Sequence, residues 1–223
     1  MNSSTSSTRL ISTLGLVAAF SGFLIVFVFQ STKPRIDENK RIAIENAVFK
    51  VVPAGAITQR SYVLTDERLQ THGQGEDIYA AYDKNNQLIG IALSGAAQGY
   101  AGIINLLYGY NPRCECITGF KVIKMTETPG LGDKIIKDPA FLSNFQALEA
   151  KLNNDKNALN NEIVTVYHGK KTHPWQIDAI SGATISSRAV GKAINTSARQ
   201  VLPQLFSQLP SITQLDGKYD KQE

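Results

Sequence analysis

The residues at positions 178–188 have the types and the spacing that could hold a phosphate group. Three small residues, Ser181, Gly182 and Ala183, precede Thr184, and a helical apolar pattern follows. Backbone N–H groups in the first turn of a helix lack partners within the helix, and they lie at the positive end of its dipole. Gly182 and Ala183 would let a bulky group approach this backbone closely. The segment therefore predicts an anion site at a helix start, with Thr184 as its central hydroxyl.

Three polar residues that follow, Ser186, Ser187 and Arg188, could add donors to phosphate oxygens. A purely structural interpretation competes with this one, because Ser and Thr before a helix are common N-caps and Ser-Gly-Ala is a common turn. The local chemistry leaves both interpretations open.

Two further segments are candidates for ligand contacts. Residues 127–132 read Glu-Thr-Pro-Gly-Leu-Gly after a predicted strand, and their two glycines predict a tight, specially shaped loop. A plain turn has the same composition. In the other segment Tyr100 lies between Gly99 and Gly102, where it either packs at a glycine bend or contacts a ligand.

The hydrophobic patterns predict the elements that position these segments. Residues 83–87 form a good hairpin connection between two strands. A helix should begin at Asp138, a natural N-cap, with Pro139 in its first turn. A second helix should span 186–202 and end before Pro203. The predicted strands are Ile78–Tyr82, Leu88–Leu93, Ile103–Tyr108, Ile117–Met125 and Ile163–Tyr167, and the buried face of the first helix is Phe141, Phe145, Leu148 and Leu152.

These elements predict one α+β domain over residues 41–210, with a largely antiparallel sheet and flanking helices. An amphipathic spacing over 44–52 predicts a helix that begins the domain. Residues 56–76 look irregular, residues 153–161 form a predicted surface loop, and residues 211–223 form a predicted charged flexible tail.

The N-terminal region predicts a membrane anchor. Residues 10–29 are almost wholly apolar and uncharged, and a helix needs about 20 such residues to cross a bilayer. The stretch ends in bulky residues that make a poor cleavage site, which favours a retained anchor at 10–30 over a cleaved signal peptide. A short tail at 1–9 precedes the anchor, and a polar linker at 31–40, which contains Pro34, follows it.

The charges around the anchor give a weak orientation. Arg9 precedes the span, whereas four cations and two acids follow it within residues 33–41. The positive-inside rule mildly favours a cytoplasmic domain, but this rule is weak where a long folded domain follows the span.

Composition excludes several classes of protein. The net charge of +4 is spread along 223 residues without a basic run, so no nucleic-acid partner is expected. Two cysteines exclude a disulfide scaffold and the usual four-ligand zinc sites. His72, His168 and His173 lack ligand spacing, so no metal is expected. No paired carboxylates or Ser/His/Asp set emerges, so no catalytic residues and no independent turnover are expected.

The cysteines, Cys114 and Cys116, form a Cys-x-Cys pair in or near a strand. On a regular strand their side chains would be about 6–7 Å apart, too far for an easy disulfide. Iron–sulfur or redox ligands are one interpretation, and two small residues near a turn are the favoured one. Trp175 is either a core residue or a stacking partner for a ring.

The motif Asp178-x-x-Ser181-Gly182-Ala183-Thr184 resembles the flavinylation signature of FMN-binding domains. In that family a flavin transferase uses FAD as donor and joins the FMN phosphate to the last threonine. The resemblance implies that Thr184 carries covalent FMN, with Ser186 and Ser187 nearby as cofactor contacts. It also implies that the transferase reads Asp178 and the small residues before Thr184.

The 127–132 segment resembles a signature of the G subunit of the Rnf electron-transport complex, and the C subunit of the sodium-translocating NADH:quinone reductase has a similar one. The resemblance implies isoalloxazine contacts from Thr128, Gly130 and Leu131. Two departures are Thr126, where many of the Rnf proteins have histidine, and Ser181, where many have threonine.

Together the two signatures imply an electron-transfer subunit of an ion-translocating, Rnf-type oxidoreductase, working with membrane subunits of a multi-subunit complex. They place it in the cell inner membrane as a single-pass protein with its domain on the periplasmic side. The alternatives are the C subunit of the quinone reductase, a flavin-based redox sensor, and an anchored binding domain without flavin. In every one of these interpretations except the domain without flavin, FMN supplies the redox chemistry, and the protein supplies position and potential.

Overall fold

The structure is a computed structural model, and it describes residues 7–65, 68–71 and 73–213. The chain divides into two units, Met1–Ala43 and Ile44–Glu223. The predicted N-terminal tail and the predicted C-terminal tail lie largely outside the described residues. Of the residues predicted to form these tails, 7–9 and 211–212 are described and are helical.

Helix α1 spans Ser7–Val51 and contains the predicted anchor. It is the one helix in the described part of the chain that is long and apolar enough to cross a membrane, and none of its most apolar 18-residue window is buried. The predicted polar linker at residues 31–40 is helical, and Pro34 lies inside α1. An ion pair between Arg41 and Glu38, three residues apart, supports the helix after the proline.

The second unit contains a seven-stranded antiparallel sheet in the order β2-β1-β3-β4-β5-β6-β7. The predicted strands and the hairpin at 83–87 are confirmed, as is the α+β class. The strands are β1 (Thr58–Leu64), β2 (Leu69–Gln70), β3 (Glu76–Tyr82), β4 (Leu88–Gln98), β5 (Ile103–Asn111), β6 (Cys116–Lys124) and β7 (Leu148–Glu149).

The prediction that residues 56–76 are irregular is wrong, because β1 and β2 lie there. β1 pairs with β3 along its whole length, from Thr58 opposite Tyr82 to Leu64 opposite Glu76. A neighbouring strand supplies partners for every backbone group on that side, and this pairing outweighs a polar composition.

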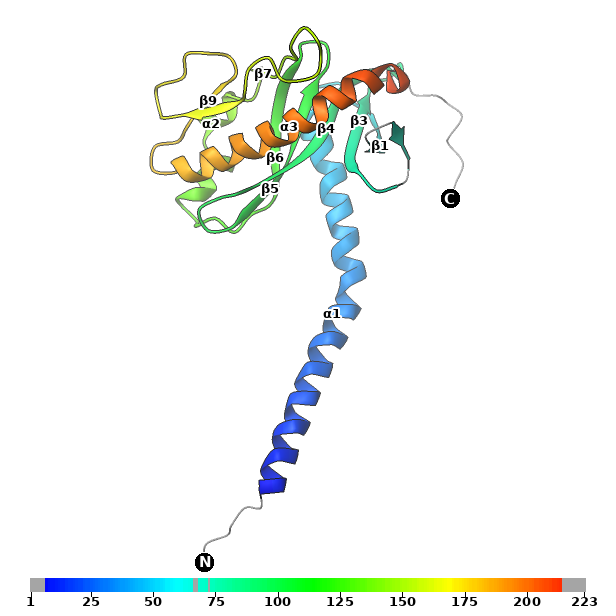
Figure 1. Cartoon of the computed structure of the whole chain (residues 1–223), viewed down its shortest axis with the longest axis vertical. Coiled ribbons are helices and arrows are strands. Elements are labelled where there is room, and N and C mark those ends of the chain that lie inside the picture. Colours follow the sequence, from blue (N-terminus) through cyan, green and yellow to red (C-terminus); the bar gives the residue numbers. More distant parts are fainter. Residues whose placement is uncertain (1–6, 66–67, 72, 214–223) are drawn as a thin grey trace, which may run out of the picture. The chain divides into compact units, whose positions relative to one another are not determined.

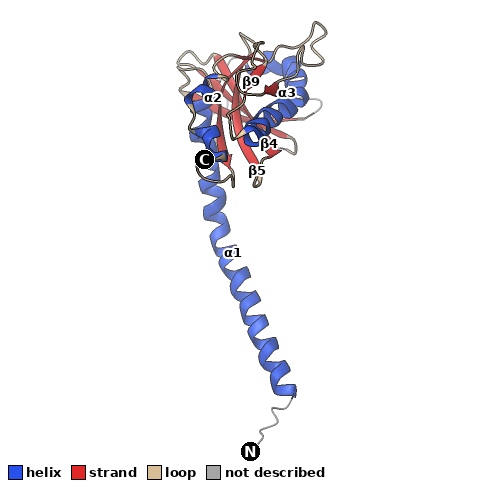
Figure 2. Ribbon diagram, turned by 90° about the vertical axis from the view of Figure 1, so that its left-hand side faces the viewer, coloured by secondary structure: helices blue, strands red, loops and turns tan. Residues whose placement is uncertain are grey.

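Two helices cover opposite faces of the sheet, because side chains alternate along each strand. On β4, Ile91 and Leu93 belong to the core with α3, which spans Thr184–Ile212, whereas Ala92 between them packs with the end of α1. Figure 1 shows α3 crossing the sheet over β4 and β5, and Figure 2 shows the same layer from the side.

Helix α3 is longer than predicted. It continues past Pro203 to Ile212, with Pro210 also inside it. Leu205 and Ile212 are both almost fully buried in the core beyond the first proline. Their burial offsets the hydrogen bond that each proline removes, which sequence alone could not show.

The predicted helix start at Asp138 is confirmed, but the helix is short. The Asp138 side chain accepts a hydrogen bond from the Phe141 N–H at 3.0 Å, and α2 ends at Ser143 (Pro139–Ser143). The chain then enters β7, so the predicted helical face through Leu152 is wrong. Phe145 is fully buried all the same, with its ring centroid 4.5 Å from that of Phe120.

Three short elements complete the domain. The 3-10 helix η1 spans Gly132–Ile136, and β8 (Val164–Val166) pairs in parallel with β9 (Gln176–Asp178) in a separate two-stranded sheet. β8 confirms the strand predicted at 163–167. α3 contacts η1 and β8, so the chain around residue 130 and the β8–β9 pair lie beside it.

Cys114 and Cys116 form a disulfide, so the prediction that they are too far apart to pair is wrong. Their Cα atoms are 5.2 Å apart. The chain between β5 and β6 is a turn, and Glu115 has a positive φ of 49°. The two cysteines therefore do not have the spacing of a regular strand.

Candidate functional site

The start of α3 and the loop that follows β6 border a hollow of about 330 Å³, here called the Thr184 hollow. Its lining brings together three segments that are far apart in the sequence. The lining residues are Tyr100, Glu127, Thr128, Leu131, Gly132, Gly182, Ala183, Thr184, Ile185 and Ser186.

The backbone before α3 places Thr184 at the first helical position. Gly182 has a φ of +78°, a conformation that suits glycine, and it turns the chain from β9 into the helix. Ala183 is at the N-cap position, and no side chain caps the helix there. The alternative in which a hydroxyl of this segment is the N-cap is therefore wrong. The N–H groups of the first turn lack a side-chain acceptor and can bind an anion.

Ser187 stabilises this turn from inside the protein. Its hydroxyl donates to the Ala183 carbonyl at 2.9 Å and accepts from the Ile180 N–H at 3.1 Å. Ser187 is fully buried and does not line the hollow, so its predicted contact with the cofactor stays a prediction. Arg188 lies over the ring of Tyr167, 4.6 Å from the centroid.

The loop at 127–132 is a tight turn held by its own hydrogen bonds. The Thr128 carbonyl accepts from the Leu131 and Gly132 N–H groups at 3.2 and 3.1 Å, and Gly130 has a φ of +78°. Asp133 accepts from the Gly130 N–H at 2.7 Å, and its bond with the Lys137 ammonium lowers its pKa from the usual value. The turn presents Thr128 and Leu131 to the hollow, and Gly130 lies at its bend.

Three exposed apolar side chains line the same hollow. Tyr100 is 71% exposed, Leu131 55% and Ile185 52%. The interpretation of Tyr100 as an aromatic packed at a glycine bend is therefore wrong. Apolar side chains gathered around one hollow are typical of a site that binds an apolar or aromatic group.

The structure brings together most of the predicted site residues. Thr184, Ser186 and Thr128 line the hollow with Gly182, Ala183 and Leu131, whereas Ser181, Ser187 and Gly130 do not line it. Sequence reasoning missed Glu127, Gly132 and Ile185. The sequence does carry a signal for Glu127, because an acid follows an apolar strand and precedes a glycine-rich loop, but its partners become visible only in the fold.

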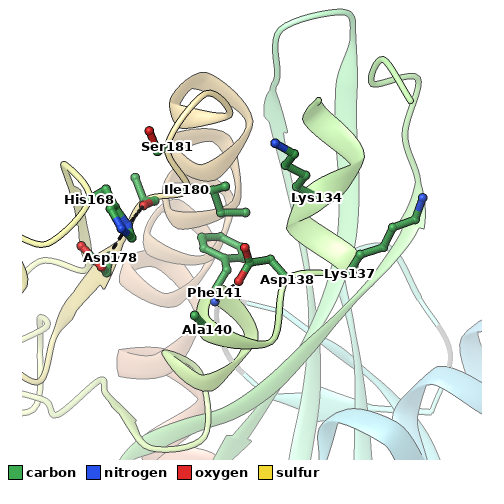
Figure 3. A pocket seen from close by; sticks show the side chains of 10 residues that line it. Lys134, Lys137, Asp138, Ala140, Phe141, His168, Asp178, Ile180 and Ser181 are labelled. Atoms are coloured by element: carbon green, nitrogen blue, oxygen red, sulfur yellow. Dashed lines mark hydrogen bonds and ion pairs between the residues drawn. The ribbon is translucent and has the colours of Figure 1, made fainter. Parts of the chain in front are cut away.

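Asp178 and Ser181 line a second hollow, of about 430 Å³. Figure 3 shows Phe141 and Ile180 next to each other there, with Lys134 to one side and the His168–Asp178 pair to the other. Asp178 accepts from the Gly169 N–H at 2.7 Å and lies 3.5 Å from His168 Nδ1. The Asp178 carboxylate thus holds the turn after β8, and its predicted recognition by a transferase stays a prediction.

Trp175 does not line either of these hollows. Its ring stacks on His173 with centroids 4.5 Å apart, and its side chain is half-buried. The structure thus leaves it outside the site around Thr184.

Comparison with known proteins agrees with this geometry. Residues 99–199, which include every residue that lines the Thr184 hollow, match the FMN-binding domain family. The chain is 30% identical over 207 residues to the G subunit of the ion-translocating oxidoreductase complex of Escherichia coli, covering 89% of this chain and 94% of the relative. It is 31% identical over 188 residues to the G subunit of the proton-translocating ferredoxin:NAD(+) oxidoreductase complex of Clostridium ljungdahlii, covering 84% and 88%.

The fold is similar to that of the C subunit of the Na(+)-translocating NADH-quinone reductase from Parabacteroides distasonis. The TM-score is 0.52 at 18% identity, over 72% of this chain and 80% of that one. The family match assigns residues 99–199 to the class of FMN-binding domains. The chain belongs to the family formed by the G subunits of ion-translocating oxidoreductase complexes.

Proposed function

We propose that the protein is the membrane-anchored electron-transfer subunit of an Rnf-type complex and that it carries FMN as a phosphoester on Thr184. The observation that carries this proposal is the position of Thr184, at the uncapped start of α3 and in the wall of the hollow. A phosphate on its hydroxyl would lie beside the free N–H groups of the first turn. The apolar residues of the same hollow would contact the isoalloxazine ring.

The attachment requires a flavin transferase with FAD as its donor. The Thr184 oxygen attacks the phosphorus next to the riboflavin part, the bond between the two phosphates breaks, AMP leaves, and a base takes the hydroxyl proton. FMN bound in this way would supply the electron transfer, and this chain would hold and orient it. The membrane subunits of the complex are the expected partners, and family membership favours the Rnf-type complex over the quinone reductase.

The test uses the full chain, expressed with a flavin transferase, and the fluorescence of flavin in a denaturing gel. The wild-type chain should retain a fluorescent label after denaturation. Thr184→Ala should lose it completely, and Thr184→Ser, which keeps a hydroxyl, should retain part of it. Thr128→Ala is the matched control and should stay labelled. A label on Thr184→Ala would place the attachment elsewhere, and an unlabelled wild-type chain would remove the covalent proposal.

We also propose that the domain lies on the periplasmic side of the inner membrane. The Cys114–Cys116 disulfide supports this side, because disulfides persist in oxidising compartments and are rare in the bacterial cytosol. The disulfide is stronger evidence than the mild charge bias around the anchor. Protease added to spheroplasts should degrade the domain, and full protection in intact spheroplasts would contradict the proposal.

A further inference from the structure

Glu127 lies buried in the wall of the Thr184 hollow and joins three segments. Its side chain is 6% exposed. Oε1 accepts a hydrogen bond from the Ala101 N–H at 2.9 Å, and Oε2 accepts one from the Ser186 hydroxyl. One carboxylate therefore connects the loop after β4, the loop after β6 and the first turn of α3.

Two glycines make room for this carboxylate. A Cβ atom at Gly99 would lie 2.6 Å from Oε1, and a Cβ atom at Gly132 would overlap Oε2. Both positions are closed to other residues while the carboxylate stays where it is. The absence of side chains at Gly99 and Gly132 thus creates the space that the buried Glu127 carboxylate occupies.

Glu127 has no cationic partner among the described residues. Within the described residues no Lys, Arg or His forms an ion pair with it, and the ion pairs of the domain lie elsewhere. Its two donors are neutral groups, and the start of α3 adds only the partial charge of a helix dipole. A carboxylate in a poorly hydrated wall keeps a stronger field than one in water, because the local dielectric is low.

We propose that Glu127 is a positioning residue whose charge lowers the reduction potential of the flavin in this hollow. The inference rests on the proposed function, since it needs FMN at Thr184. Reduction adds negative charge to the isoalloxazine, and a fixed carboxylate in the same wall opposes it. Charged groups near the ring are one of the ways in which a protein tunes a flavin. Ser186, on the same helical turn as Thr184, fixes the carboxylate relative to the attachment point.

The test is the midpoint potential of the flavin in the full-length, flavinylated chain, measured in detergent by spectroelectrochemistry. Glu127→Gln keeps the shape of the side chain and removes its charge. The midpoint should shift to a more positive potential, with reduction favoured at least tenfold, which is about 30 mV for a two-electron couple. Glu127→Met, of similar shape, repeats the measurement if the amide is poorly accommodated.

Two variants separate charge from other effects. Ser186→Ala removes a hydrogen bond but keeps the carboxylate, so it should not raise the midpoint. Glu162→Gln removes an exposed acid that is paired with Arg199. Arg199 lies 13 residues after Ser186 in α3, so the helical rise places this ion pair about 20 Å from Ser186. This distance exceeds the Debye length of roughly 8 Å at physiological salt, so the midpoint should not change.

Flavin content is read separately, by fluorescence in the denaturing gel. A folded, labelled Glu127→Gln chain with the wild-type midpoint would overturn this inference and leave the proposed function intact. A folded variant without flavin would also overturn it, because the residue would then act in loading. A positive shift in Ser186→Ala as large as that in Glu127→Gln would assign the effect to the hydrogen bond. Failure of the proposed function would be seen in the wild-type chain, as an absence of label.

Discussion

The two faces of the sheet are built in opposite ways. The face under α3 is filled by large side chains such as Leu93 and Tyr108, which are almost fully buried. The face under the end of α1 is lined by small residues such as Ala81 and Ala92, and there the helix backbone comes close to the strands. The Val51 carbonyl accepts a hydrogen bond from the Thr118 hydroxyl at 2.6 Å. Packing of large side chains stabilises the face under α3, and close approach of the α1 backbone to the strands stabilises the other face.

This difference has a consequence for function. α3 must place Thr184 and Ser186 within the wall of a hollow, and a filled core fixes a helix against rotation and sliding. The end of α1 connects the sheet to the predicted anchor. It must be attached firmly to the sheet, but it does not position residues of the Thr184 hollow. The two faces should therefore respond differently to removal and to addition of side-chain volume.

Removal of volume on the α3 face should have the largest effect on stability. Leu93→Ala deletes a buried side chain and leaves a cavity, which should lower the free energy of unfolding by about 2–5 kcal/mol. Denaturant unfolding of the full chain in detergent, followed by circular dichroism, measures it. A loss below about 1 kcal/mol would mean that this face is not held by packing.

Addition of volume should damage the α1 face next. A Cβ atom at Gly109 would overlap the Val51 carbonyl oxygen, so Gly109→Ala should cost about 1–3 kcal/mol. Gly119 lies opposite on β6, and a Cβ there would be 3.7 Å from Val51 Cα, an ordinary contact. Gly119→Ala is therefore the matched control and should be nearly neutral in the same unfolding experiment. Equal losses from both variants would contradict the close-approach argument.

A backbone substitution at the start of α3 should separate stability from function. Gly182 and Gly169 have similar positive φ values, 78° and 74°, and open space at the Cβ position. Alanine at either site should cost about 1–2 kcal/mol, because the left-handed conformation is strained for other residues. Flavin labelling should fall for Gly182→Ala alone, since only Gly182 lines the Thr184 hollow. Equal labelling of both variants would show that this turn does not position Thr184.

Loss of one hydrogen bond on the α1 face should give the smallest change. Thr118→Val keeps the shape of the side chain and removes the bond to Val51, which should cost about 1 kcal/mol. Thermal unfolding should detect this, while the flavin midpoint potential should stay at the wild-type value. A changed midpoint would show that the two faces are coupled.

Most of the framework could be predicted from local sequence patterns. The strands after residue 76 and the hairpin at 83–87 follow from apolar runs separated by turn residues. The cap at Asp138 follows from a side-chain oxygen placed just before a proline. The small residues and hydroxyls at 178–184 predict a phosphate site, and their resemblance to a family signature implies the cofactor.

The errors lie where distant parts of the chain supplied the deciding contact. β1 forms because β3 pairs with it, and α3 continues through Pro203 because the sheet buries Leu205 and Ile212. The disulfide between Cys114 and Cys116 forms because the chain turns between them.

The sequence by itself determined the class of fold, the apolar anchor segment and the candidate attachment residue, because each depends on neighbouring residues or on a contiguous motif. Only the tertiary structure decided that Thr184 starts an uncapped helix in a shared hollow, and that Glu127 lies in the same wall. These facts depend on contacts between Glu127, Ala101 and Ser186, which are distant in the sequence and meet only when the sheet and α3 pack together.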